Sequence, residues 1–139
     1  MNNSEQMCPS ARSLLPELRP DPVAAVRAGL PYAALERIQS HLGVSTARLA
    51  PMLGVSPRTL RRRRDTGTLA PEESDRLVLL AEVIALARQA FDGAEPAREW
   101  LRTPHSLLGG ESPFDRMDTV AGMDAVKTMI YHVEHGMPV

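Results

Sequence analysis

Arginine is concentrated in one short stretch of this chain, where five guanidinium groups fall within seven positions. If a helix begins at Pro57 and buries Leu60, then Arg58 and Arg62 point most directly outward. Arginine donates hydrogen bonds in a rigid fork that matches guanine edges and phosphate oxygens. We therefore predict a DNA-binding helix. Its candidates are Arg58, Thr59, Arg61 and Arg62 for base contacts, Arg48, Arg63 and Arg64 for phosphates, and Ser56 as the helix cap.

Two other interpretations of the arginine stretch stay open. It also fits a solvated or salt-bridged helix face, and it fits a surface for an acidic partner protein or for self-association. The whole chain has a formal net charge of −1. A nucleic acid is therefore expected to contact a local basic patch and not the surface at large.

The residues around this stretch have the spacing of a helix-turn-helix. Ala50 is small enough for a second helix to approach, and Gly54 allows the positive φ that the turn requires. Ser56 and Pro57 predict the start of the second helix. Pro51 departs from the pattern, because it removes one hydrogen bond and is expected to shorten or kink the first helix.

The composition indicates which elements position these residues. With 139 residues, 43% hydrophobic and 4% aromatic, the chain can bury one small core or two that share a central element. Glycine and proline separate apolar stretches of helical period, and we find no convincing strand. The sequence therefore predicts an all-α fold, in which an N-terminal helix-turn-helix bundle is joined by a long central helix to a small helical domain.

The predicted boundaries follow the helix start and stop signals. Residues 1–20 are polar and proline-punctuated, and we expect a flexible arm that orders only on a partner. The helix-turn-helix domain is assigned to 21–69, the connecting helix to 70–93 and the last domain to 94–139. The connecting helix is apolar nearly all round, so it must be covered on most sides. A dimer contact and the core helix of a monomer are both compatible with that pattern.

Enzyme chemistry has little support in the sequence. His132 and His135 share a helix face, but Glu134 points away from both, and no further metal ligand lies nearby. Cys8 is the only cysteine, which excludes a disulfide within one chain and favours a reducing cytoplasm. We expect a cytoplasmic protein that is not an enzyme and has no metal, no cofactor and no membrane segment.

The C-terminal third has its own pattern of anchors and turns. Trp100 is expected to anchor a small core, Pro104 to end its helix, and Gly109 and Gly110 to form a compact turn. Asp115 is expected to bond nearby backbone donors. The last helix has one apolar stripe and a second, unoccupied face. The stripe consists of Met123, Val126, Ile130 and Val133.

The ordered set of residues in this region resembles the Xre/MbcA/ParS family of antitoxins. The likeness extends from about residue 30 onward, and the residues before it are not matched. It also includes the stretch 69–77 with its sequence Pro-Glu-Glu-Ser-Asp-Arg. The matching residues of the last domain are Trp100, Leu101, Pro104, Leu107, Gly109, Gly110, Pro113, Asp115, Gly122, Val126 and Gly136.

The resemblance implies a type II toxin–antitoxin pair. The partner would be a RES-domain toxin that destroys NAD, and the antitoxin would also repress the shared operon through operator DNA. We predict that the C-terminal part closes the entrance of the toxin's active site, although a frayed tail that contacts nothing is the alternative. The candidate toxin-binding residues are Trp100, Lys127, Tyr131, Glu134, His135, Met137, Pro138 and Val139.

A second function class fits much of the same sequence. A plain helix-turn-helix transcriptional regulator would use its C-terminal half to dimerise or to sense a ligand. A neighbouring gene for an NAD-consuming enzyme would favour the antitoxin. In both cases we expect a homodimer, because such proteins usually read two half-sites. A higher toxin–antitoxin complex is expected only in the first case.

Overall fold

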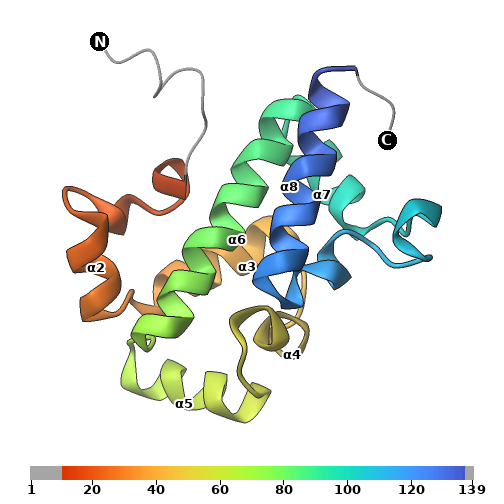
Figure 1. Cartoon of the computed structure of the whole chain (residues 1–139). Helices are drawn as coiled ribbons and strands as arrows, with labels where there is room; N and C mark the ends of the chain where they lie inside the picture. Colours follow the sequence, from red (N-terminus) through yellow and green to blue (C-terminus); the bar gives the residue numbers. More distant parts are fainter. Residues whose placement is uncertain (1–10, 137–139) are drawn as a thin grey trace.

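The computed structural model describes residues 11–136, and within them every regular element is a helix. Figure 1 shows the long helix α6 through the middle of the molecule, with α8 along one side and the N-terminal elements on the other. The predicted all-α class is confirmed. The α-helices are α2 (Pro22–Ala28), α3 (Tyr32–Leu42), α4 (Thr46–Leu49), α5 (Pro57–Thr66), α6 (Pro71–Ala90), α7 (Ala94–Arg102) and α8 (Val120–Glu134). The 3-10 helices are η1 (Ala11–Ser13), η2 (Pro16–Leu18), η3 (Ala50–Leu53), η4 (Ser106–Leu108) and η5 (Phe114–Asp118).

Local start and stop signals explain most of these bounds. Asp21 accepts hydrogen bonds from the backbone N–H groups of Val23 and Ala24, at 3.1 and 3.3 Å, and so caps α2. Thr119 caps α8 in the same way, because its hydroxyl accepts from the N–H of Gly122 at 2.9 Å. Gly43 ends α3 in the left-handed conformation that glycine adopts without strain.

The expected arm is partly wrong. Residues 1–10 lie outside the described part of the chain, but residues 11–18 form η1 and η2 and bury Leu14, Leu15 and Leu18 in the core. Leu15 and Leu18 are 0% and 2% exposed. Burying a leucine contributes about 1.5–3 kcal/mol, which offsets the cost of ordering so short a segment. The segment is too short to show a helical period, so its polar and proline-rich composition was misleading.

The helix-turn-helix region has the predicted irregularity. The segment around Pro51 is the 3-10 helix η3 instead of a continuation of α4, because proline has no N–H to donate. Gly54 follows with φ +74° and makes the turn into α5. Ala50 and Leu60 are both fully buried, so the first and second helices pack closely as predicted.

Helix α6 is the centre of a single core. It contacts α8, α7, α3, α2, η1 and η3, so the chain itself covers most of its apolar surface. Leu77, Leu80 and Val83 are completely buried along it. The helix therefore belongs to both halves of the molecule. Whether it also forms a dimer contact stays a prediction.

The segment between α7 and α8 reverses the chain through two turns. Gly109 and Gly110 both have positive φ, and the hydroxyl of Ser112 accepts from the N–H of Asp115 at 3.1 Å. Helix α8 then returns along α6 and buries Met123, Val126 and Ile130. The predicted compact turn is confirmed, and so are three residues of the predicted apolar stripe, whereas the fourth, Val133, is only half-buried.

Candidate functional site

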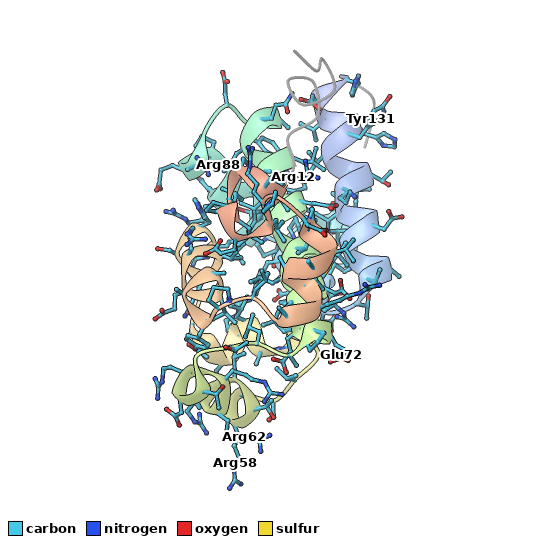
Figure 2. The ribbon with its side chains drawn as sticks, turned by 90° about the vertical axis from the view of Figure 1, so that its left-hand side faces the viewer. Arg12, Arg58, Arg62, Glu72, Arg88 and Tyr131 are labelled. Atoms are coloured by element: carbon cyan, nitrogen blue, oxygen red, sulfur yellow. The ribbon has the colours of Figure 1, made fainter. Side chains whose placement is uncertain are left out.

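The second helix of the helix-turn-helix, α5, presents its arginines at one end of the molecule. Its cap is Ser56, whose hydroxyl accepts from the N–H of Thr59 at 3.1 Å. Leu60 is buried beneath the helix, and Figure 2 shows Arg58 and Arg62 extending away from the body of the protein. This orientation leaves their guanidinium groups in solvent, where a groove of DNA could approach them.

The outward face of α5 carries a surplus of positive charge. Arg58, Arg61, Arg62 and Arg64 are exposed, and within residues 11–136 none of them forms an ion pair. Thr59 is half-buried, and its hydroxyl accepts from that of Ser56 at 3.2 Å. The four arginines form the basic patch that the low net charge of the chain requires for nucleic-acid contact.

Arg63 faces the protein and not solvent. Its guanidinium group donates to both carboxylate oxygens of Glu73, at 2.9 and 3.0 Å. The N–H of Ala70 also donates to Glu73, at 2.9 Å. Burial raises the pKa of Glu73, but these hydrogen bonds and the charge of Arg63 outweigh it, so the pKa lies below the ordinary value of 4.5. The predicted phosphate contact from Arg63 is therefore wrong for this conformation, because the side chain neutralises a buried carboxylate.

Arg48 is also engaged within the chain. Its Nη2 lies 2.8 Å from Oδ1 of Asp115, and its guanidinium carbon lies 5.0 Å from the ring centre of Phe114. Burial raises the pKa of Asp115. Hydrogen bonds with Ser112 and Arg48 lower the pKa by more than burial raises it, so it lies below the ordinary value of 3.8. The prediction placed Arg48 at a phosphate, and the structure uses it to join the helix-turn-helix to the C-terminal region.

Trp100 lies at the edge of the core. Its ring centre is 4.9 Å from that of Phe91 and 5.4 Å from that of His105. The side chain is half-buried, so it packs the end of α6 against α7 and the following turn. It is the anchor that the sequence predicts, and one side of it stays accessible to a partner.

Helix α8 and the C-terminal half of α6 form a shallow groove of about 330 Å³. Lys127 Nζ lies 3.3 Å from Glu82 Oε2, and this ion pair joins α8 to α6. Tyr131 is 54% exposed at the rim. The lining residues are Leu86, Asp124, Lys127, Thr128, Ile130, Tyr131 and Glu134.

The end of α8 carries an exposed aromatic cluster next to this groove. The rings of Tyr131 and His135 are stacked with their centres 4.0 Å apart, and His135 Nδ1 lies 2.9 Å from the carbonyl oxygen of Tyr131. Glu134 and His135 are exposed. Met137, Pro138 and Val139 lie outside the described residues. The structure thus brings together four predicted residues, Lys127, Tyr131 and Glu134 at the groove and His135 stacked on Tyr131, while Trp100 lies on another element.

Some groove residues were missed by sequence reasoning. Asp124 and Thr128 share a face of α8 with Lys127 and Tyr131, at the three- and four-residue spacing that helices require. That period was present in the sequence and could have identified them. The contribution of Leu86 could not be found in this way, because it comes from α6, 45 positions before Tyr131.

Two further findings concern other kinds of site. In the described part of the chain, no three His, Cys, Asp or Glu side chains are placed to hold a metal ion. No helix among residues 11–136 is long and apolar enough to span a bilayer.

The fold has two parts that share the central helix α6. The first part is a helix-turn-helix, which is a fold of the DNA-binding class, and the second is a small helical domain with an open groove. Residues 21–82 match the model of the antitoxin Xre-like helix-turn-helix domain. Residues 86–136 match that of the antitoxin Xre/MbcA/ParS C-terminal toxin-binding domain. The chain belongs to the Xre family of antitoxins.

Curated relatives and a solved structure agree with this assignment. Antitoxin Xre of Yersinia enterocolitica is 30% identical over 83% of this chain and 79% of its own length. The Prs ADP-ribosylating antitoxin of a Sphingobium species is 25% identical over 84% of this chain and 79% of its own length. A chain from the M. tuberculosis MbcT-MbcA toxin-antitoxin complex shares the fold, with a TM-score of 0.55, 24% identity, and coverage of 78% of this chain and 96% of its own.

Proposed function

We propose that this antitoxin neutralises a RES-domain toxin that degrades NAD, by covering the entrance of the toxin's active site with its C-terminal part. The observation that carries the proposal is the groove between α6 and α8, which has the exposed Tyr131 at its rim and lies in the toxin-binding domain. Exposed tyrosines beside apolar surface are frequent centres of binding energy in protein interfaces. The RES class of toxin comes from the family resemblance.

The charges around the groove support a mixed apolar and polar contact. Lys127 is held by Glu82, so its charge is partly neutralised before any partner binds. Asp124 and Glu134 have no ion pair within residues 11–136, and they leave the rim with a negative excess. We infer that the toxin meets this rim with basic side chains, such as an enzyme uses to hold the phosphates of NAD.

The test is to express the adjacent gene product with and without this protein, and to measure NAD, growth and co-purification. We expect NAD to fall with the toxin alone and to be restored together with a stable complex. The Tyr131→Ala change should weaken the complex at least ~30-fold, on the ~2 kcal/mol scale of interface hot spots. Val120→Ala is the matched control, because Val120 is 51% exposed on the same helix but lies outside the groove.

The tail requires a test of its own. We propose that Met137, Pro138 and Val139 extend the contact into the active-site entrance. Deleting these three residues should reduce inhibition of NAD degradation more than it reduces complex formation. Unchanged inhibition would contradict the role of the tail and would leave the groove as the inhibitory surface.

We further propose that a dimer of this protein represses its own operon through α5. The unpaired arginines on the outward face support this role, and two copies would read two half-sites. Replacing Arg58 and Arg62 with alanine should weaken operator binding at least ~10-fold, since each good base contact is worth about 1–3 kcal/mol. Toxin inhibition should be unchanged. Arg27→Ala, at an exposed arginine on α2, is the control for general loss of positive charge.

A further inference from the structure

Arg88, near the C-terminal end of α6, is a half-buried arginine without a counter-charge. Every other half-buried arginine in the described chain has a partner. Four of them form ion pairs, which are Arg37–Glu17, Arg63–Glu73, Arg98–Glu95 and Arg116–Glu111. The fifth, Arg76, donates to the carbonyl oxygens of Met52 and Asp118. No ion pair or hydrogen bond of the Arg88 guanidinium group is found within residues 11–136. Partial burial of an unpaired cation is unfavourable. An anion bound next to Arg88 would offset this cost.

Arg88 lines a cavity between α6 and the N-terminal segment. The cavity has a volume of about 190 Å³, and its other lining residues are Ser13, Leu14 and Ala85. Arg12 projects from η1, which packs directly on α6. Figure 2 shows the side chains of Arg12 and Arg88 on the same face, at the opposite end of the molecule from Arg58 and Arg62. Arg88 thus lines the cavity itself, and Arg12 directly precedes the lining residue Ser13.

The surrounding charges make this region positive. The pKa of His41 is lowered by burial and then by the positive charges of Arg88, Arg98 and Arg37. Two carboxylates of the region are already engaged, since Glu17 binds Arg37 and Glu95 binds Arg98. Arg12 and Arg88 form no ion pair within residues 11–136.

We propose that Arg12 and Arg88 bind a phosphoryl group in the cavity between η1 and α6. The guanidinium fork matches phosphate oxygens, and two cations match the charge of a phosphate dianion. The cavity has room for a small group. DNA held by α5 is too far away to supply it, because 17 helical residues separate Arg88 from the start of α6, a rise of about 25 Å. The phosphate is either free in solution or part of a nucleotide.

The experiment is a titration of the full-length protein with millimolar inorganic phosphate and, separately, with adenosine monophosphate, at constant ionic strength set with chloride. Heat of binding and the NMR signals of His41 are the readouts. Arg88-dependent binding of either compound supports the site, and binding of adenosine monophosphate alone would identify a nucleotide as the source. A bound dianion offsets the field of Arg88, so the pKa of His41 should rise when phosphate is added.

The variants separate a binding site from a structural role. Arg88→Met keeps the apolar stem of the side chain and should weaken phosphate binding at least ~10-fold, as loss of a charged fork predicts. Arg12→Met should weaken it less, and Arg27→Met should leave it unchanged. If neither compound binds the wild-type protein or moves the His41 titration, the proposal is wrong, and Arg88 serves only to complement the negative end of the α6 dipole. The wild-type titration gives this answer even if a variant does not fold.

Discussion

Neighbouring arginines on α5 have different environments. Arg62 extends into solvent, whereas Arg63, the next residue, forms a two-pronged ion pair with Glu73 beneath the helix. The carboxylate of Glu73 is only 4% exposed, so it depends on Arg63 for its neutralisation. Residue type alone therefore does not separate the DNA-facing arginines from the structural one. Helix phase does.

This pair gives a matched comparison of two substitutions. Arg63→Met should destabilise the fold by about 2–3 kcal/mol, because it leaves a buried carboxylate without its charged donor. Arg62→Met should change stability by less than about 0.5 kcal/mol, as exposed substitutions do, but should weaken operator binding. Urea denaturation and a DNA-binding assay on both variants would measure the two effects. Equal stability of the two variants would contradict the assignment of Arg63 to the core.

The pH dependence of stability should include a contribution from Glu73. Its folded-state pKa is lowered below 4.5, so its stabilisation is fully present above pH 4.5 and is lost as the pH falls through the lower folded value. Glu73→Gln removes this contribution. The stability difference between wild type and Glu73→Gln should be largest near neutral pH and should shrink as the pH falls below 4.5. A difference that does not change with pH would show that Glu73 is not ionised in the folded protein.

At the scale of elements, the contact between η5 and α8 determines how the last helix is seated. Gly122 lies in the first turn of α8, and a Cβ placed on it would lie 1.6 Å from the backbone carbonyl oxygen of Arg116. That oxygen belongs to the main chain and cannot rotate away. Glycine is required at position 122 because the backbone of η5 approaches it closely, and not because of its own backbone angle.

Gly122→Ala should therefore move α8 relative to η5. We expect a loss of about 1–3 kcal/mol from overpacking, in spite of the better helix propensity of alanine. Ala121→Ser, at the exposed neighbouring position, is the control and should be nearly neutral. Thermal unfolding of the two variants measures the effect. A stabilised Gly122→Ala protein would mean that α8 is not packed on η5 in solution.

At the scale of the molecule, the two functional parts share one core. Buried residues form a single cluster that runs from the N-terminal leucines through α6 to α8. Arg48 and Arg76 add polar connections, since Arg48 binds Asp115 and Arg76 donates to the carbonyl oxygens of Met52 and Asp118. The helix-turn-helix is therefore not an independent module.

We expect the full chain to unfold in one cooperative transition. A fragment that ends at residue 92 should lose most of its helical structure, because it lacks α8 and exposes the apolar side of α6 that α8 covers. Circular dichroism during thermal unfolding would compare the fragment with the full chain. A fragment that melts cooperatively would show that the DNA-binding part folds without the C-terminal domain.

Sequence patterns were sufficient wherever the cause of a structure is local. The cap Ser56, the turn at Gly54 and the interruption at Pro51 depend on a few neighbouring residues, so the sequence was enough to predict them. The all-helical class and the family followed from patterns of the same kind, spread over more of the chain.

The tertiary structure alone decided what distant residues do to one another. Arg63 is paired with Glu73 and Arg48 with Asp115, and the leucines of residues 11–18 are buried instead of flexible. The groove, too, needs Leu86 from α6 and Tyr131 from α8. The physical reason is that ion pairing and burial depend on distance in space. A sequence specifies which groups are available, and only the packing of the helices brings them within a few ångströms of each other.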